Sequence, residues 1–324
     1  MSSGERIAVI DCGTNTFNLL VGESLGDKHR FLHRSKRVVK IGTRSDPFSP
    51  IPEPALARAF YALWSFRMIL DKLRVKKIVA TGTAALRDSS NGKEFLKKVK
   101  QELGFDIRLI PGEREAELIC SGVWQAVRMD DSISLIMDIG GGSTEFILCN
   151  ERKIFWKKSY RLGAARLLAW WNPGNPPGTK DIHRLNILLC KELYELIEAC
   201  QSFKPKLLVG ASGSFETITA LMYRGKGMNT PRRNEIEIPI GDFRSVHHKL
   251  ITSTQAERLV MPGMLRMRAD MMVPATLLIS FVMKNTGIGN MRLSRFALKE
   301  GLFFESISSG SPENRVTSQS KTKL

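Results

Sequence analysis

The sequence of 324 residues lacks the features of an exported, membrane-embedded or zinc-binding protein. Its N-terminus has neither the basic start nor the small-residue cleavage site of a secretory signal. The longest apolar stretch, residues 271–283, is interrupted by proline and hydroxyl residues and is too short to span a bilayer. Five cysteines without any C-x-x-C spacing indicate reduced thiols rather than a disulfide framework. We expect a cytoplasmic protein that does not bind membranes.

Acidic residues are scarce relative to basic ones: 32 Asp and Glu stand against 49 Lys and Arg, a formal net charge of +17. A field of this strength concentrates polyanions near the surface and raises their rate of encounter. Nucleic acid is one such partner, and a condensed phosphate chain is another. The hydrophobic content of 43% and the charged content of 25% are those of a globular protein, and the length favours two domains.

The most informative stretch, residues 133–149, reads as a strand, a glycine turn and a second strand. Residues 140–142 are consecutive glycines, whose backbone N–H groups can approach a bulky anion because no Cβ atom intervenes. Asp138 before the turn and Glu145 after it add hard oxygen ligands, which suit Mg²⁺ better than an anion. The expected occupant is a metal-bound phosphate.

An earlier stretch repeats this pattern. A strand at residues 6–10 ends in Asp11 and a polar turn with glycine at residues 13–15, and a second strand follows at residues 17–22. Asp11 precedes its turn as Asp138 precedes the later one, 127 residues on (138 minus 11). A lone turn of this kind is weak evidence, since Asp and Gly are the commonest turn residues. Two matching copies predict a duplicated fold whose phosphate hairpins face each other across a cleft.

Three further stretches are candidate parts of the same site, and each has a purely structural alternative. Arg87, in a loop after the strand at residues 77–80, either binds phosphate bidentately or is a surface residue. The small residues at 212–214, where a helix begins near Ser214, either bind an anion or only cap the helix. A basic strand pair at residues 28–40 either lines the path of a polyanion or forms a solvated sheet edge.

Acidic residues crowd the first turns of a predicted helix at residues 113–128, namely Glu113, Glu115 and Glu117. The helix dipole favours negative charge at this end, which is a complete structural explanation. A catalytic role would also require a position at the cleft between the two hairpins. Strand-to-helix loops at the C-terminal edge of a sheet provide such a position.

In this order the motifs resemble those of the exopolyphosphatase and guanosine pentaphosphate phosphohydrolase family over nearly the whole chain. The matching stretches are the two hairpins, an arginine motif, a glutamate motif, a third glycine turn and two late motifs, at residues 11–15, 138–145, 81–87 with 91–92, 112–118, 210–217, 268–270 and 297–301. The resemblance implies an α/β fold of two ribonuclease-H-like domains, as in the actin, sugar kinase and heat-shock chaperone superfamily, with the active site in the interdomain cleft. We expect a first domain, a C-terminal helix that completes it, a second domain and a disordered basic tail, at residues 1–128, 294–306, 129–293 and 307–324.

The resemblance also implies hydrolysis of the terminal phosphate of inorganic polyphosphate, or of the 5′ phosphate of guanosine pentaphosphate, with Mg²⁺, or with Mn²⁺ in its place. Glu115 then orients and deprotonates the attacking water, while Asp138 and Glu145 hold the metal. The phosphate-binding residues implied are Asp11, Gly13, Thr14, Asn15, Arg87, Gly140, Gly141, Gly142, Ser143, Ser212, Gly213 and Ser214. Arg114 stands where family members commonly carry a second glutamate, which changes the charge beside Glu115.

The basic surplus fits a polymer better than a nucleotide, because a long polyphosphate meets many Lys and Arg residues at once. Nucleic acid is not the expected partner, guanosine penta- and tetraphosphate are secondary ones, and the residues leave a homodimer open. Two rivals remain. One is an ATP-dependent kinase or actin-like ATPase of the same superfamily, against which Glu115 argues. The other is a non-catalytic sensor of polyphosphate or alarmones. It is made conceivable by Arg114 and by residues 211–214, which contain less glycine than the third turn of the family.

Overall fold

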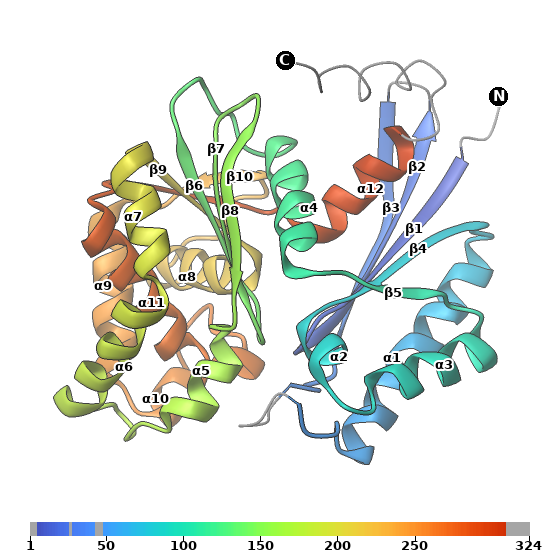
Figure 1. The fold of residues 1–324 in the computed structure, drawn as a ribbon, viewed down its shortest axis with the longest axis horizontal. Helices are drawn as coiled ribbons and strands as arrows, with labels where there is room; N and C mark the ends of the chain where they lie inside the picture. The colour runs from blue at the N-terminus through green and yellow to red at the C-terminus, as the bar shows by residue number, and fades with distance from the viewer. Residues whose placement is uncertain (1–4, 26–27, 43–47, 309–324) are drawn as a thin grey trace, which may run out of the picture.

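The computed structural model describes residues 5–25, 28–42 and 48–308, which form two β-sheets with flanking helices (Figure 1). The elements of the N-terminal part are β1 Glu5–Cys12, β2 Thr16–Leu25, β3 Lys28–Val38, α1 Glu53–Lys72, β4 Lys77–Gly82, α2 Ala84–Asp88, α3 Gly92–Leu103, β5 Ile107–Leu109 and α4 Gly112–Trp124. Those of the C-terminal part are β6 Ser134–Ile139, β7 Thr144–Cys149, β8 Ile154–Tyr160, α5 Ala164–Trp171, α6 Thr179–Glu192, α7 Tyr194–Phe203, β9 Leu207–Ala211, α8 Ser212–Gly225, β10 Glu235–Glu237, α9 Ile240–Thr252, α10 Gln255–Leu259, the 3₁₀ helix η1 Arg266–Arg268, α11 Met272–Thr286, β11 Asn290–Ser294 and α12 Leu298–Ser308.

The first sheet has the strand order β3-β2-β1-β4-β5, in which β1, β4 and β5 are parallel and β2 and β3 antiparallel. Its central strand β1 is buried over residues 7–10, as an unbroken apolar run predicts. Residues 28–38 form a single edge strand rather than the predicted strand pair. Most basic side chains of β3 are exposed, so they mainly solvate an edge that would otherwise invite pairing with another chain.

The second sheet repeats the first. Taken from β8, its order is β8-β7-β6-β9-β11, with β10 added beyond β11. β6, β9 and β11 are parallel, and β7 and β8 are antiparallel, as in the first sheet. The predicted two-domain α/β fold is therefore confirmed, while the domain limits at residues 128 and 129 stay a prediction.

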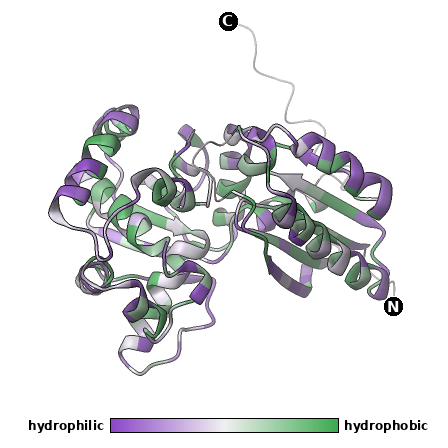
Figure 2. Ribbon diagram, turned by 90° about the horizontal axis from the view of Figure 1, so that it is seen from below, coloured by the Kyte–Doolittle hydropathy of each residue, from purple (hydrophilic) through white to green (hydrophobic). Residues whose placement is uncertain are grey.

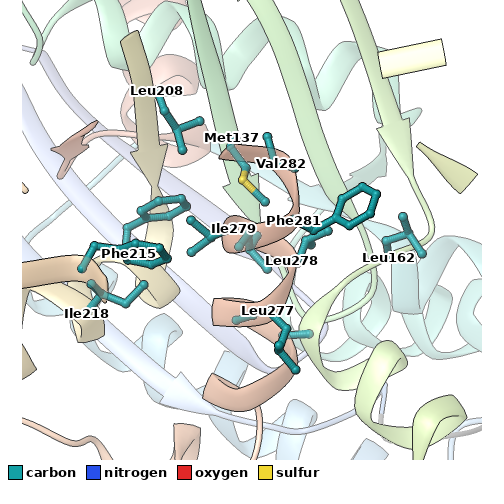
Figure 3. Close-up of a cluster of buried hydrophobic side chains, with 14 of the residues drawn as sticks. Met137, Leu162, Leu208, Phe215, Ile218, Leu277, Leu278, Ile279, Phe281 and Val282 are labelled. Carbon is teal, nitrogen blue, oxygen red and sulfur yellow. The ribbon is translucent and has the colours of Figure 1, made fainter. Parts of the chain in front are cut away.

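Each sheet is covered by helices that bury its apolar side chains, and hydrophilic residues gather on the outer sides of these helices (Figure 2). In the second domain α11 is buried over almost its whole length. Figure 3 shows Ile279 and Val282 of this helix beside Met137 of β6 and Leu208 of β9. These residues belong to one buried cluster, so a dense core supports the strand β6 that leads to the candidate site.

Two helices are exchanged between the halves. α4 follows β5 of the first sheet but packs against β7 and β8, whereas α12 follows β11 of the second sheet but packs against β1 and β2. The two helices also pack against each other between the sheets (Figure 1). A Cβ atom on Gly122 would collide with Ala297 O, and one on Gly301 with Leu118 O, so glycine is needed for this close approach. Their side chains join both sheets into one shared core.

Several boundaries differ from the sequence-based expectation. The helix predicted at residues 113–128 ends at Trp124. The predicted tail begins at residue 307, but residues 307 and 308 belong to α12, and residues 309–324 lie outside the described part of the chain. All five cysteines are unpaired, and Cys190 is exposed whereas the other four are buried. Within the described ranges, no helix is both long enough and apolar enough to cross a membrane.

Candidate functional site

The site lies where the two sheets present the carboxyl ends of β1 and β6, their central strands. Both strands end in turns of the same geometry. In the first, the Gly13 N–H donates to Thr16 O (3.1 Å), and in the second the Gly140 N–H donates to Ser143 O (3.0 Å). In each sheet the turn follows the central strand and is closed by a hydrogen bond between corresponding residues. The two halves therefore contain the same turn.

The two turns contact each other. A Cβ on Gly141 would collide with the Asn15 side chain, and a Cβ on Gly142 would lie 2.8 Å from Thr14 Oγ1. The Asn15 amide also donates to Met271 Sδ (3.0 Å) in the second domain. The hairpins thus face each other as the duplicated pattern predicts. The missing Cβ atoms of Gly141 and Gly142 allow this approach, and the binding of an anion by their N–H groups stays a prediction.

A cavity of about 120 Å³ lies between the hairpins, several times the roughly 10–15 Å³ that one water needs. Of the predicted site residues, Arg87 and Ser214 do not line it: Ser214 is buried within α8, and Arg87 lies next to Glu115. All the others do, namely Asp11, Gly13, Thr14, Asn15, Glu115, Asp138, Gly140, Gly141, Gly142, Ser143, Glu145, Ser212 and Gly213.

Three carboxylates in the cavity are almost inaccessible: Glu115, Asp138 and Glu145 are 8%, 5% and 1% exposed. Two serine hydroxyls hold the pair on the second hairpin, since Ser212 Oγ donates to Asp138 Oδ2 (2.8 Å) and Ser159 Oγ to Glu145 Oε1 (2.7 Å). Burial raises the pKa of Asp138 to about 6. Burial and the charge of Asp138 raise the pKa of Glu145 to about 8.

Glu115 lies in the first turn of α4, where the exchanged helix passes the hairpins. Burial, and then the charges of Glu145, Asp11 and Asp138, raise its pKa well above the ordinary value. Its Oε2 is buried and forms no hydrogen bond with any described residue. A buried polar oxygen of this kind is unfavourable unless water or a ligand binds it. Interaction with the helix dipole explains acids at the start of α4 in general, but it does not explain why Glu115 is buried with an unpaired oxygen.

Arg87 lies beside Glu115. Its Nη1 lies 4.0 Å from Glu115 Oε2 and donates to Ile110 O (3.0 Å), and its Nε pairs with Asp88 (3.3 Å). The residue belongs to the short helix α2, not to the predicted loop, because residues 84–88 complete a helical turn after β4. Its positive charge can stabilise the ionised form of Glu115.

Sequence reasoning missed three basic residues that line the cavity: Lys36, Arg268 and Lys299. A Cβ on Gly213 would collide with the Arg268 guanidinium, so this glycine makes room for a cation. Arg268 Nε is buried and donates to no described residue. Burial, and then the positive charge of Arg268, lower the pKa of Lys36. Signals existed in the basic strand and in the two late motifs, but nothing in the sequence showed that they converge.

The cavity offers two carboxylates, Asp138 and Glu145, as ligands for Mg²⁺. Among the described residues, no group of three or more His, Cys, Asp or Glu side chains could hold a metal ion. Mg²⁺ bound to phosphates commonly takes only one or two carboxylates and fills its remaining positions with water and phosphate oxygens. Asp138 and Glu145 lie opposite each other on β6 and β7, and burial is the main cause of their raised pKa values, so a nearby cation would favour their ionised forms. The two residues therefore fit such an ion.

Comparison with known proteins gives one consistent answer. Residues 21–309 match the Ppx/GppA phosphatase family. A curated relative, exopolyphosphatase 1 of Mycobacterium bovis, is 27% identical over 315 residues, covering 94% of this chain and 89% of the relative. A solved exopolyphosphatase structure from Cytophaga hutchinsonii is 37% identical with a TM-score of 0.91, covering 94% of this chain and 98% of that one.

A family member from Aquifex aeolicus shares the fold at 21% identity, with a TM-score of 0.79 and coverage of 95% of this chain and 99% of that one. The match is thus to the whole two-domain unit and not to one half of a duplicated fold. The chain belongs to the Ppx/GppA phosphatase family.

Proposed function

We propose that the protein is an exopolyphosphatase, which releases the terminal phosphate of inorganic polyphosphate. Glu115 carries the proposal: it is a buried carboxylate with an unpaired oxygen, in a cavity between two glycine hairpins. Three basic side chains in the same cavity suit an anionic substrate. Membership of a phosphatase family makes the protein a hydrolase, and the relatives from M. bovis and C. hutchinsonii named exopolyphosphatases support this substrate class.

In the proposed reaction, the N–H groups of the two turns hold the terminal phosphate, and Lys36, Arg268 and Lys299 neutralise its oxygens. Glu115 accepts a proton from the attacking water, whose oxygen forms a bond to phosphorus as the phosphoanhydride bond breaks. The bonding electrons leave with the shortened chain. Burial raises the pKa of Glu115, which makes its ionised form a stronger base than an ordinary carboxylate.

Asp138 and Glu145 are the residues we propose for Mg²⁺ or Mn²⁺, and when bound the ion supplies charge neutralisation of the phosphoryl oxygens. Ser212 and Ser159 then keep the two carboxylates in one orientation by donating to one oxygen of each.

The direct test is phosphate release from long polyphosphate, tripolyphosphate and guanosine pentaphosphate, each with and without Mg²⁺. We expect release from polyphosphate that depends on Mg²⁺ and weakens as salt increases, because the net charge of +17 assists binding. Release that is faster from guanosine pentaphosphate would identify the other activity implied by the family resemblance. Phosphotransfer from ATP to an acceptor would indicate a kinase, and tight binding without release a sensor. Either result would contradict the proposal.

A further inference from the structure

Three arginines converge on one buried aspartate beside the cavity. Arg87 and Asp88 end α2 in the first domain, Arg161 follows β8, and Arg166 lies on α5 of the second. Arg87 Nε, Arg166 Nη2 and Arg161 Nε lie 3.3, 3.2 and 3.8 Å from the Asp88 carboxylate. The Asp88 side chain is only 5% exposed, so this is a built cluster that joins the two halves.

The cluster carries more positive charge than its own aspartate balances. Three guanidinium groups face one carboxylate, and each guanidinium has five N–H donors of which the carboxylate can engage few. Burial, and further the charges of Arg161 and Arg87, lower the pKa of Arg166 even though Asp88 opposes this effect. A second anion with several oxygens would satisfy these donors and relieve the repulsion.

The arginines are positioned rather than loosely exposed. The Arg161 guanidinium stacks over the Phe48 ring at 5.0 Å. The backbone N–H of Arg166 donates to Gly141 O (3.1 Å), which fixes α5 to the glycine turn of the second hairpin. The row of guanidiniums starts 4.0 Å from Glu115 at Arg87 and reaches solvent at Arg161, whose side chain is 58% exposed.

We propose that Arg87, Arg161 and Arg166 form a subsite for the phosphate units that follow the one being cleaved, so that the protein selects chains over single phosphates. This inference rests on the proposed function. Asp88 orients the guanidiniums before the substrate binds and limits their affinity for it, because its own charge repels a phosphate. Nothing in the turnover step requires the two second-domain arginines, so their role is recognition of chain length.

The test compares Arg161→Gln and Arg166→Gln with Arg152→Gln. Arg152 precedes β8 at the end opposite Arg161, and its side chain is 71% exposed, which makes it a matched control. For each subsite variant we expect KM for long polyphosphate to rise about tenfold, as loss of a charge-assisted hydrogen bond predicts. KM for tripolyphosphate should rise less, and kcat should change less than KM. Equal KM values for all three variants and wild type would overturn the subsite.

Asp88→Asn separates a subsite from a simple ionic contact between the halves. Asparagine keeps an acceptor for the arginines but removes the charge that repels phosphate. We expect a lower KM for long polyphosphate and a steeper dependence on salt. If the Asp88–Arg166 pair only joins the halves, this variant will instead raise KM as the arginine variants do, and the proposal fails.

Binding of labelled polyphosphate to Glu115→Gln protein, followed by fluorescence anisotropy, separates this inference from the proposed function. If wild type releases no phosphate but the Arg166→Gln change weakens this binding about tenfold, the hydrolase assignment fails and the subsite stands. If wild type hydrolyses polyphosphate and binding is unaffected by both arginine changes, only the subsite fails. Melting temperatures of all variants identify any that do not fold, and Arg161→Gln, at an exposed position, tests the subsite by itself in that case.

Discussion

The two hairpins are copies of one structure that carry different charges. Asp11 pairs in register with Asn18 on β2, and Asp138 pairs in the same register with Glu145 on β7. In the first hairpin the Asn18 amide donates to Asp11 Oδ2 (2.9 Å), so the aspartate is satisfied within its own hairpin. In the second, two carboxylates lie opposite each other and depend on serines from elsewhere. Duplication thus explains two glycine turns of one geometry, while the difference between Asn18 and Glu145 limits the proposed cation site to the second hairpin.

We expect the largest effect from removing Glu115, the base that we propose for the cavity between the two hairpins. We expect Glu115→Gln to lower kcat by about 10²–10⁴, the usual contribution of a general base. The control is Glu113→Gln, an exposed acid on the same helix turn, which should leave phosphate release unchanged. Normal hydrolysis by the Glu115→Gln variant would show that Glu115 is not the general base.

Making the second hairpin resemble the first should have the next largest effect. We expect Glu145→Asn to lower phosphate release about 10–100-fold and to abolish most of its dependence on Mg²⁺, because the proposed ion loses one of two ligands. The reciprocal change, Asn18→Glu, should reduce release much less, and its free energy of unfolding should fall by about 1–3 kcal/mol because a charge is left without its partner. Comparable loss of release in the two variants would contradict the asymmetry.

The raised pKa values of Asp138 and Glu145 in the second hairpin predict that the stability of the protein depends on pH. Acids whose pKa values are raised on folding stabilise the protein below their unfolded values, and this stability is lost as pH rises through the folded values. For Asp138 and Glu145 these are about 6 and about 8. Metal-free protein should therefore have a lower melting temperature at pH 9 than at pH 6, and Mg²⁺ should restore it. Glu145→Gln should show a weaker decline with pH, whereas an unchanged slope would contradict the assignment.

The smallest effect concerns the serine that holds Asp138, a role that Asn18 fills in the first hairpin. Ser212 has a left-handed backbone (φ 63°), which glycine adopts without strain. Ser212→Ala and Ser212→Gly both remove the hydrogen bond to Asp138, but only the alanine variant keeps the strain. Urea unfolding should find the glycine variant more stable than the alanine variant by about 1 kcal/mol. Equal stabilities would show that the backbone is not strained.

Local sequence patterns predicted the parts of the site that one stretch of chain builds. Apolar runs around a glycine turn identified both hairpins, whereas Glu115 was singled out by the resemblance to the family's glutamate motif. What could not be predicted depends on packing between distant segments. Lys36 comes from an edge strand and Arg268 from a 3₁₀ helix, and they meet only because the two sheets close on each other. The position of Arg87 depends on the short helix α2. Helix propensity cannot predict a helix of only five residues, because its stability comes from packing.

The exchange of α4 and α12 has a consequence for how the chain unfolds. Each half needs a helix supplied by the other to cover its sheet, so that loss of either half exposes the apolar residues of the shared core. We therefore expect the two halves to unfold together in one cooperative transition on heating or in denaturant. A fragment ending near residue 128 should not fold by itself. The duplication that produced two similar halves has left neither of them autonomous.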